Sequence, residues 1–144
     1  MSNEKSVSVS RVIAAPPEKI FDVIASPAGH AEMDGSGTVR AALKGPERLE
    51  LGSKFRMDMK QGIPYRINSV VKEYEENRLI AWAHLGRHRW RFELEPVEGG
   101  TRVTHTFDWS TSPIGKLLEW GGIPERHPTA MARTLERLEE IVTR

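Results

Sequence analysis

The sequence predicts an α+β domain in which an antiparallel meander of short strands is followed by one long helix. Three observations lead to this fold class. Apolar and polar residues alternate over most of the stretch between residues 55 and 109, which is the period of strands with one buried face. A single apolar stripe recurs at helical spacing near the end of the chain. Two short helical patterns follow the first predicted strand.

The first elements are a strand and a short helix. Residues Ser6 to Ile13 are rich in β-branched side chains, which favours a strand, but the pattern leaves open which of them face inward. Pro16 and Pro17 suit the start of a helix, and Glu18 favours its first turn. The apolar face of this helix consists of Ile20, Phe21 and Ile24.

A second short helix is expected directly after the first. Ser26 is a suitable N-cap, and Pro27 then occupies the first helical position. The helix is predicted to extend from Ala28 to about Asp34 and to end at Gly35. His30 lies on this helix, and we expect it to be exposed to solvent.

The centre of the chain is predicted to form strands joined by short turns. A weaker strand is expected between Thr38 and Leu43. After it, residues of one parity are apolar on each successive strand, which predicts an antiparallel meander. The inward-facing series are Phe55, Met57 and Met59; Tyr65, Ile67, Ser69 and Val71; Ile80, Trp82 and His84; His88, Trp90, Phe92 and Leu94; and Val103, His105, Phe107 and Trp109.

Turn lengths fix which residues of a meander lie opposite one another. Turns at residues 76–77, 85–87 and 97–100 keep the apolar residues on one face of the sheet. Polar groups then collect beside a belt of aromatic residues, a pattern typical of a small-molecule pocket. The predicted register has three rows across the sheet: Ser69, His84, His88 and Trp109; then Val71, Trp82, Trp90 and Phe107; then Glu73, Ile80, Phe92 and His105.

The last part of the chain is predicted to be helical. A short helix is expected from Ile114 to Trp120, where glycines follow. A long helix starts at Pro124 or Pro128, since both prolines suit a first turn better than a helix interior. Its apolar stripe has the spacing i, i+4, i+7 and i+11 and consists of Met131, Leu135, Leu138 and Val142.

Length and composition exclude several classes of protein. A chain of 144 residues is the size of one domain, and we predict a single domain over residues 1–144. The formal net charge of +1 gives no overall field that would attract nucleic acid. Zero cysteines exclude a disulfide framework and favour a reducing compartment. No apolar run is long enough for a signal peptide or a membrane span. We therefore expect a cytoplasmic monomer or homodimer that binds no nucleic acid and has no stable membrane insertion.

The predicted inward-facing histidines do not suit a metal site. His105 lies two rows from His88, which is about 13 Å along the strand at ~3.3 Å per residue. Zinc–nitrogen bonds of about 2 Å cannot span this gap. His84 and His88 are neighbours, yet their row supplies no third ligand. We expect no metal and no other cofactor.

The order of these elements resembles a known family. The segments "AAPPEKIFDVIASP", "HRWRFELEP" and "GGTRVTHTFDWS", followed by a long amphipathic helix, are similar to the START-like helix-grip superfamily (SRPBCC), and within it to the polyketide cyclase/dehydrase and lipid transport group. The resemblance covers nearly the whole chain. It implies a curved antiparallel sheet of six to seven strands wrapped around the C-terminal helix, with a cavity between them for hydrophobic molecules.

The resemblance also implies which residues line that cavity. The sheet face described above becomes the floor, and the C-terminal helix becomes the roof. The segment 113–123 is a candidate lid over the mouth. The family offers no universal catalytic motif, and the arginines of the meander fall on the outer face by parity. The expected ligand-binding residues are Met57, Met59, Tyr65, Ser69, Trp82, His84, His88, Trp90, Phe92, His105, Phe107, Trp109, Met131 and Leu135.

Three functions remain open from the sequence. The first is binding of one hydrophobic or aromatic small molecule, such as a polyketide-, lipid- or sterol-like compound. The second is a polyketide cyclase or dehydratase in which His84, His88 or His105 acts as acid or base, because imidazole titrates near pH 6.5. The third is an interaction protein whose cavity is vestigial.

Overall fold

The computed structural model describes residues 6–33, 39–44, 48–61, 63–83, 89–108 and 123–143. Within these ranges the side chains of residues 27, 28, 31, 39–44, 57–61, 63–68 and 123–127 are not described. The elements, in chain order, are β1 (Ser6–Ile13), α1 (Pro17–Ile24), α2 (Pro27–Met33), β2 (Val39–Lys44), β3 (Lys54–Gln61), β4 (Ile63–Glu75), β5 (Leu79–Ala83), β6 (Arg89–Val97), β7 (Gly100–Asp108) and α4 (Ile123–Val142).

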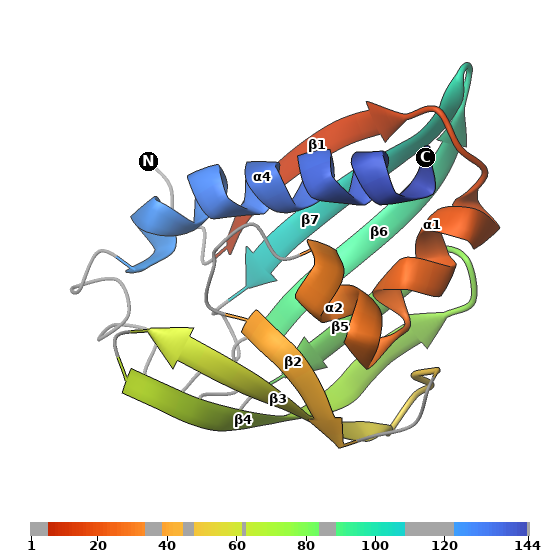
Figure 1. The fold of residues 1–144 in the computed structure, drawn as a ribbon. Helices are drawn as coiled ribbons and strands as arrows, with labels where there is room; N and C mark the ends of the chain where they lie inside the picture. Colours follow the sequence, from red (N-terminus) through yellow and green to blue (C-terminus); the bar gives the residue numbers. More distant parts are fainter. Residues whose placement is uncertain are drawn as a thin grey trace.

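The strands form one antiparallel sheet with the order β1-β7-β6-β5-β4-β3-β2. Each strand from β2 to β6 pairs with the next along the chain, whereas β1 crosses over to pair with β7. The sheet curves around α4, and α1 and α2 lie beside α4 over the same face (Figure 1). We call this concave, helix-covered face the inner face and the opposite one the outer face. The predicted α+β helix-grip architecture is confirmed, with seven strands.

The inner face is held together by the stripe on α4. Leu135, Leu138 and Val142 are buried in the main core with Phe92 and Val103 of the sheet, and Met131 is buried as well. The sequence left open which residues of β1 face inward, and the pairing of β1 with β7 answers this question. Val7 lies opposite Phe107 and Val9 opposite His105, so the odd-numbered residues of β1 face α4.

The helix starts follow the predicted capping chemistry in part. Ser26 Oγ accepts a hydrogen bond from the Gly29 amide at 3.3 Å, as an N-cap of α2 does. α4 begins at Ile123, so Pro124 lies in its first turn. Of the two predicted starts, Pro124 and Pro128, the structure agrees with Pro124. Pro128 lies inside α4, where its missing N–H would have bonded the carbonyl of Pro124. No helix in the described ranges combines the length and the apolar character that a bilayer span needs.

The predicted registers of the β5–β6 and β6–β7 hairpins are confirmed where the structure describes them, and so is one pair of the β4–β5 hairpin. Leu94 pairs with Val103, Trp90 with Phe107 and Phe92 with His105 in the β6–β7 hairpin. The β5–β6 pairs are Ile80 with Phe92 and Trp82 with Trp90. Val71 pairs with Trp82 in the β4–β5 hairpin.

The β4–β5 hairpin also contains the one row that was predicted wrongly. Its turn has three residues, 76–78, with Asn77 in the left-handed region at φ 64°, and a β-bulge lies between Val71 and Glu73. The extra turn residue and the bulge cancel, which is why Val71 is still opposite Trp82. Between the bulge and the turn the register differs: Tyr74, not Glu73, lies opposite Ile80.

The bulge places Glu73 on the outer face, opposite Ala81 and next to the arginines of β6. Glu73 accepts hydrogen bonds from Arg89 (2.7 Å) and from Arg91 (2.8 Å and 3.1 Å). Arg91 also contacts Asp108 at 3.3 Å. The hydrogen bond from Arg91 lowers the pKa of Glu73 below its usual 4.5, and the same bond raises the pKa of Arg91. Arg89 and Arg91 were predicted to point outward, and on the outer face they form ion pairs with the Glu73 carboxylate.

Replacing Glu73 by glutamine should lower the free energy of unfolding at neutral pH by about 1–3 kcal/mol, the usual value of hydrogen bonds to charged groups. A carboxylate whose folded pKa is depressed stabilises the fold above its unfolded pKa near 4.5, and this stabilisation is lost as the pH falls through the lower folded value. The difference between Glu73→Gln and the parent protein should therefore shrink below pH 4.5 in urea unfolding. Glu95→Gln, in an exposed pair with Arg102 at 3.7 Å, is the matched control and should change stability by less than about 1 kcal/mol. An equal loss for Glu73→Gln at every pH would contradict this assignment.

Candidate functional site

Six rings form a continuous belt along the inner face, from α2 across β5, β6 and β7. Antiparallel alternation gives Trp82, Trp90, Phe92, His105 and Phe107 the same inward direction, and the sixth ring comes from α2. The centroid distances between successive rings are 4.3 Å for His30–Trp82, 5.8 Å for Trp82–Phe92, 4.0 Å for Phe92–His105, 5.5 Å for His105–Trp90 and 4.6 Å for Trp90–Phe107. We call these six residues the aromatic belt.

Trp90 differs from the other five rings of the aromatic belt in its exposure. Phe92 and Phe107 are each 1% exposed, and the other three rings are also buried. Trp90 is half-buried, although it faces inward and packs on buried neighbours. Trp90 is therefore the most solvent-accessible member of the aromatic belt.

Trp90 lies where the core divides. Leu135, Leu138 and Val142 of α4 belong to the main core, whereas Met131 forms a second, smaller cluster with Phe107. Trp90 packs against both groups. Trp90 therefore lies at the boundary between the main core and the smaller cluster at the Met131 end of α4.

His30 is buried, and the expectation that it is solvent-exposed is wrong. Its ring is 6% exposed and stacks on Trp82 with an interplanar angle of 23°. The Phe55 ring packs edge-on against it, with the two ring centroids 5.4 Å apart. His30 Nε2 lies 2.7 Å from the carbonyl oxygen of Ile24, and because a carbonyl only accepts, Nε2 donates this bond. The sequence contains one indication of this burial: His30 and Met33 are three residues apart, so they lie on the same side of α2.

The close approach of α2 to α1 puts His30 in this position. A side-chain carbon added to Gly29 would overlap the carbonyl oxygen of Val23, so only glycine allows the two helices to meet at this distance. At the other end of α2, Arg137 of α4 donates hydrogen bonds to the Glu32 carbonyl at 2.8 Å and 3.0 Å. The position of α2 over the sheet is therefore fixed from both α1 and α4.

Arg48 fixes α1 against the β4–β5 turn. It donates hydrogen bonds to Asp22 of α1 at 2.6 Å and to Glu76 of the turn at 2.7 Å. Its guanidinium lies 5.7 Å from the centroid of the Phe21 ring. The hydrogen bond to Glu76 is the main cause of the raised pKa of Arg48. The Leu49 amide also donates to the Ala25 carbonyl at 2.6 Å, which holds the corner between α1 and α2.

The structure describes only part of the predicted site. Ser69 is buried and lies opposite Phe55. Met57, Met59 and Tyr65 occupy paired positions on β3 and β4, but their side chains are outside the description. Phe92 and Leu135 lie in the main core. The residues outside the described ranges are His84, His88, Trp109 and the candidate lid 113–123 apart from Ile123, where α4 begins.

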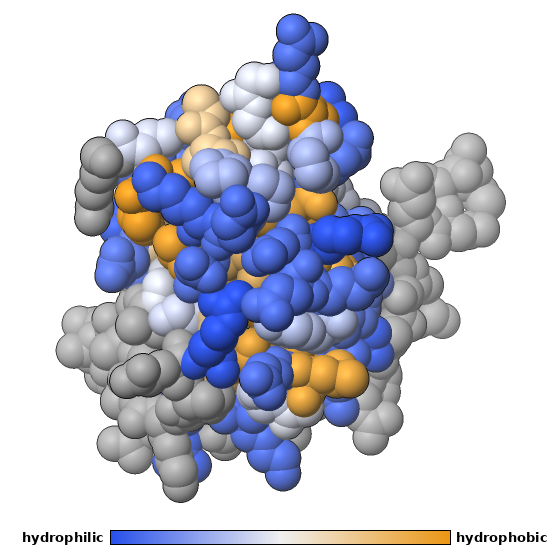
Figure 2. Space-filling model, turned by 90° about the vertical axis from the view of Figure 1, so that its right-hand side faces the viewer, coloured by the Kyte–Doolittle hydropathy of each residue, from blue (hydrophilic) through white to orange (hydrophobic). Residues whose placement is uncertain are grey.

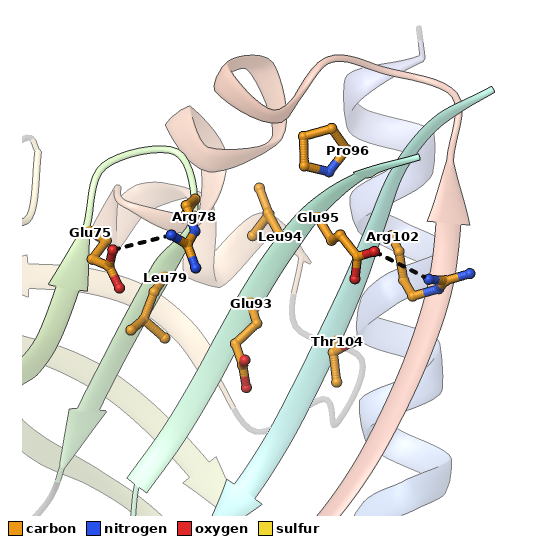
Figure 3. A pocket seen from close by; sticks show the side chains of 9 residues that line it. All are labelled: Glu75, Arg78, Leu79, Glu93, Leu94, Glu95, Pro96, Arg102 and Thr104. Atoms are coloured by element: carbon orange, nitrogen blue, oxygen red, sulfur yellow. Dashed lines mark ion pairs between the residues drawn. The ribbon is translucent and has the colours of Figure 1, made fainter. Parts of the chain in front are cut away.

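The outer face offers a groove of different character. It has a volume of about 550 Å³ and lies along β5, β6 and β7 beside the β4–β5 turn (Figure 3). Its charged side chains pair with one another, Arg78 with Glu75 at 3.5 Å and Arg102 with Glu95 at 3.7 Å. These side chains are largely solvated. The side of the molecule drawn in Figure 2 is also mostly hydrophilic, with hydrophobic residues in small separate spots. The inner face is therefore the better candidate site.

The contact between Gly29 and α1 generates a prediction about His30. Gly29→Ala should push α2 away from α1 and weaken the stack of His30 on Trp82, and His30→Ala removes the same stack directly. The two losses should therefore not add: the double variant should be more stable than their sum predicts by about 1 kcal/mol or more. Urea unfolding of the four proteins measures this coupling, and near-ultraviolet circular dichroism reports the environment of Trp82. Additivity within about 0.5 kcal/mol would show that Gly29 does not position His30.

Solved structures with the same fold are numerous, and three illustrate the likeness. Protein NE0264 from Nitrosomonas europaea matches with a TM-score of 0.76 and 18% identity, covering 99% of this chain and 97% of that one. Protein Ms6760 from Mycobacterium smegmatis matches with a TM-score of 0.74 and 14% identity over 98% and 92% of the two chains. KanY protein (ms6282) matches with a TM-score of 0.75 and 13% identity over 99% and 100%. At these identities the likeness concerns the fold.

Sequence comparison gives nearer relatives. "Uncharacterized protein Rv0088" of Mycobacterium tuberculosis strain H37Rv is 41% identical over 140 residues, which are 93% of this chain. "Uncharacterized protein MT0096" of strain CDC 1551 is 40% identical over the same length. The chain spans only 62% of the length of these relatives. The family model described as polyketide cyclase / dehydrase and lipid transport matches residues 4–143. The chain therefore belongs to the polyketide cyclase/dehydrase and lipid transport family.

Proposed function

We propose that this protein binds a hydrophobic, ring-containing small molecule on the inner face, against Trp90 and beneath the Met131 end of α4. The observation that carries the proposal is the half-buried Trp90 in an otherwise buried aromatic belt. Membership of a cyclase and lipid transport family supports a ligand-binding role.

The chemistry around Trp90 suits such a ligand. Small-molecule sites have mostly apolar and aromatic walls with a few polar groups that set orientation. Here Phe107 and Met131 supply apolar surface next to Trp90, and His105 lies 5.5 Å from the Trp90 ring. An aromatic ring that stacks on Trp90 would gain about 0.5–1.5 kcal/mol beyond the area that it buries. Ring compounds should therefore bind better than open chains of equal size.

The remaining candidate ligand contacts extend the same surface. We include Trp82 because it belongs to the aromatic belt, and Ser69 because it faces inward on β4, the strand next to β5. The other members of the proposal rest on parity along their strands or on proximity to the turns: Met57, Met59, Tyr65, His84, His88 and Trp109.

Replacing Trp90 by leucine should weaken binding of the neutral fluorescent probe N-phenyl-1-naphthylamine about tenfold, because the stacked ring is lost and 1.4 kcal/mol corresponds to a factor of ten. Tyr74→Leu is the matched control. Tyr74 is also half-buried, but it packs on Phe21 of α1 with a centroid distance of 5.6 Å, away from Trp90. Its replacement should change affinity by less than about twofold. Titration of probe emission measures both. Equal affinity of Trp90→Leu and the parent protein would contradict the proposed site, and so would an equal loss in both variants.

The second candidate function is a polyketide cyclase or dehydratase. The observation that favours it is the position of His105, whose imidazole lies between Phe92 and Trp90 in the aromatic belt. Imidazole is the side chain whose ordinary pKa, near 6.5, is closest to neutral pH, which makes histidine the commonest general acid or base. A substrate held against Trp90 would bring its enolisable carbons to this ring.

Under this second function, His105→Gln should lower turnover of a poly-β-ketone substrate by about a hundredfold or more, which is the usual contribution of a general acid or base. Binding of N-phenyl-1-naphthylamine should change only a few-fold, since glutamine retains a polar side chain. Product formation and probe titration on the same preparations separate the two effects. His84→Gln and His88→Gln are tested in the same way. Unchanged product formation in all three variants would remove histidine chemistry and leave ligand binding.

A further inference from the structure

We propose, resting on the proposed function, that the inner-face site selects uncharged ring compounds and discriminates against their ionised analogues, anionic and cationic alike. The ligand class is a neutral ring molecule whose polar groups are hydroxyls or carbonyls. Carboxylates, sulfonates and ammonium compounds are excluded.

The first support is the composition of the wall. Among the residues that the structure describes, the buried polar ones are His30, Ser69, Thr101, His105, Thr106 and Thr134, and no Asp, Glu, Lys or Arg is buried. The polar members of the aromatic belt are the imidazoles of His30 and His105, with Ser69 buried nearby on β4. His30 already donates a hydrogen bond from Nε2 to the Ile24 carbonyl. Imidazole and hydroxyl groups can form hydrogen bonds with a hydroxyl or a carbonyl of a ligand.

The second support is the location of the charges. In the part of the chain that is described, each ion pair lies at the rim or on the outer face. Arg11 of β1 pairs with Glu139 of α4 at 2.8 Å at the edge of the sheet. Arg48 pairs with α1 and the β4–β5 turn. Glu73 holds Arg89 and Arg91 on the outer face.

Arg11 and Arg91 are also already paired with carboxylates. The carboxylate of Glu73 raises the pKa of Arg91, and Glu139 does the same for Arg11. Withdrawing Arg91 to neutralise a ligand would leave the partly buried Glu73 carboxylate without a partner, which is costly. Arg11 and Glu139 form an exposed pair at the edge of the sheet. An anion on the inner face would therefore have to shed its water without receiving a countercharge. A cation meets the same barrier, apart from weak attraction to the ring faces.

The test uses three ligands with one ring system and different charges: 2-naphthylmethanol, 2-naphthoate and 2-naphthylmethylammonium. Each is used at pH 7 to displace N-phenyl-1-naphthylamine from the full chain. The alcohol should reach half-displacement at a concentration at least about tenfold below that of either ion, and the two ions should compete about equally poorly. The same ranking is expected for Glu73→Gln, because the arginines that it releases are on the outer face.

The outcomes distinguish the two proposals. If the probe binds and either ion competes as well as the alcohol, a charged partner lies in the site and the inference is overturned while the proposed function stands. If naphthoate gains affinity in Glu73→Gln, the anion binds to the arginines of the outer face, and the inference is again overturned. If neither the probe nor the alcohol binds, the proposed function fails and the inference fails with it.

Discussion

The packing of α4 against the inner face is the interaction on which the rest of the structure depends. Antiparallel strands alternate their side chains, so residues of matching register on β1, β5, β6 and β7 all point toward one side. α4 covers that side with a single apolar stripe. The same contact closes the deep end of the core and leaves Trp90 at the boundary between its two clusters.

Much of this arrangement could be predicted from the sequence, because the length of a hairpin turn determines which residues of the next strand face the same side of the sheet. Once a short turn fixes one pair, every later pair follows, and Trp82, Trp90 and Phe107 fall in one row. The β-bulge before Glu73 could not be predicted in this way, because a bulge shifts the register without any turn residue to mark it. A signal was present at Asn77, since asparagine tolerates the left-handed conformation that a three-residue turn requires.

The site was predictable where it lies on strands and was not where it lies on a helix. Five rings of the aromatic belt follow from alternation, whereas His30 depends on how two short helices meet. A polar residue on a short helix is usually solvated, and only the approach of Gly29 to Val23 and the carbonyl of Ile24 make its burial favourable. His84 and His88, the pair that the sequence emphasised, lie outside the described residues.

The most direct measurement locates a bound ligand. Intermolecular nuclear Overhauser effects between N-phenyl-1-naphthylamine and the isotope-labelled protein report which side chains lie within contact distance. The account predicts contacts from the ligand to the indole of Trp90, the ring of Phe107 and the methyl group of Met131. Contacts to Leu79 and Thr104 in the outer groove, without any to Trp90, would contradict it.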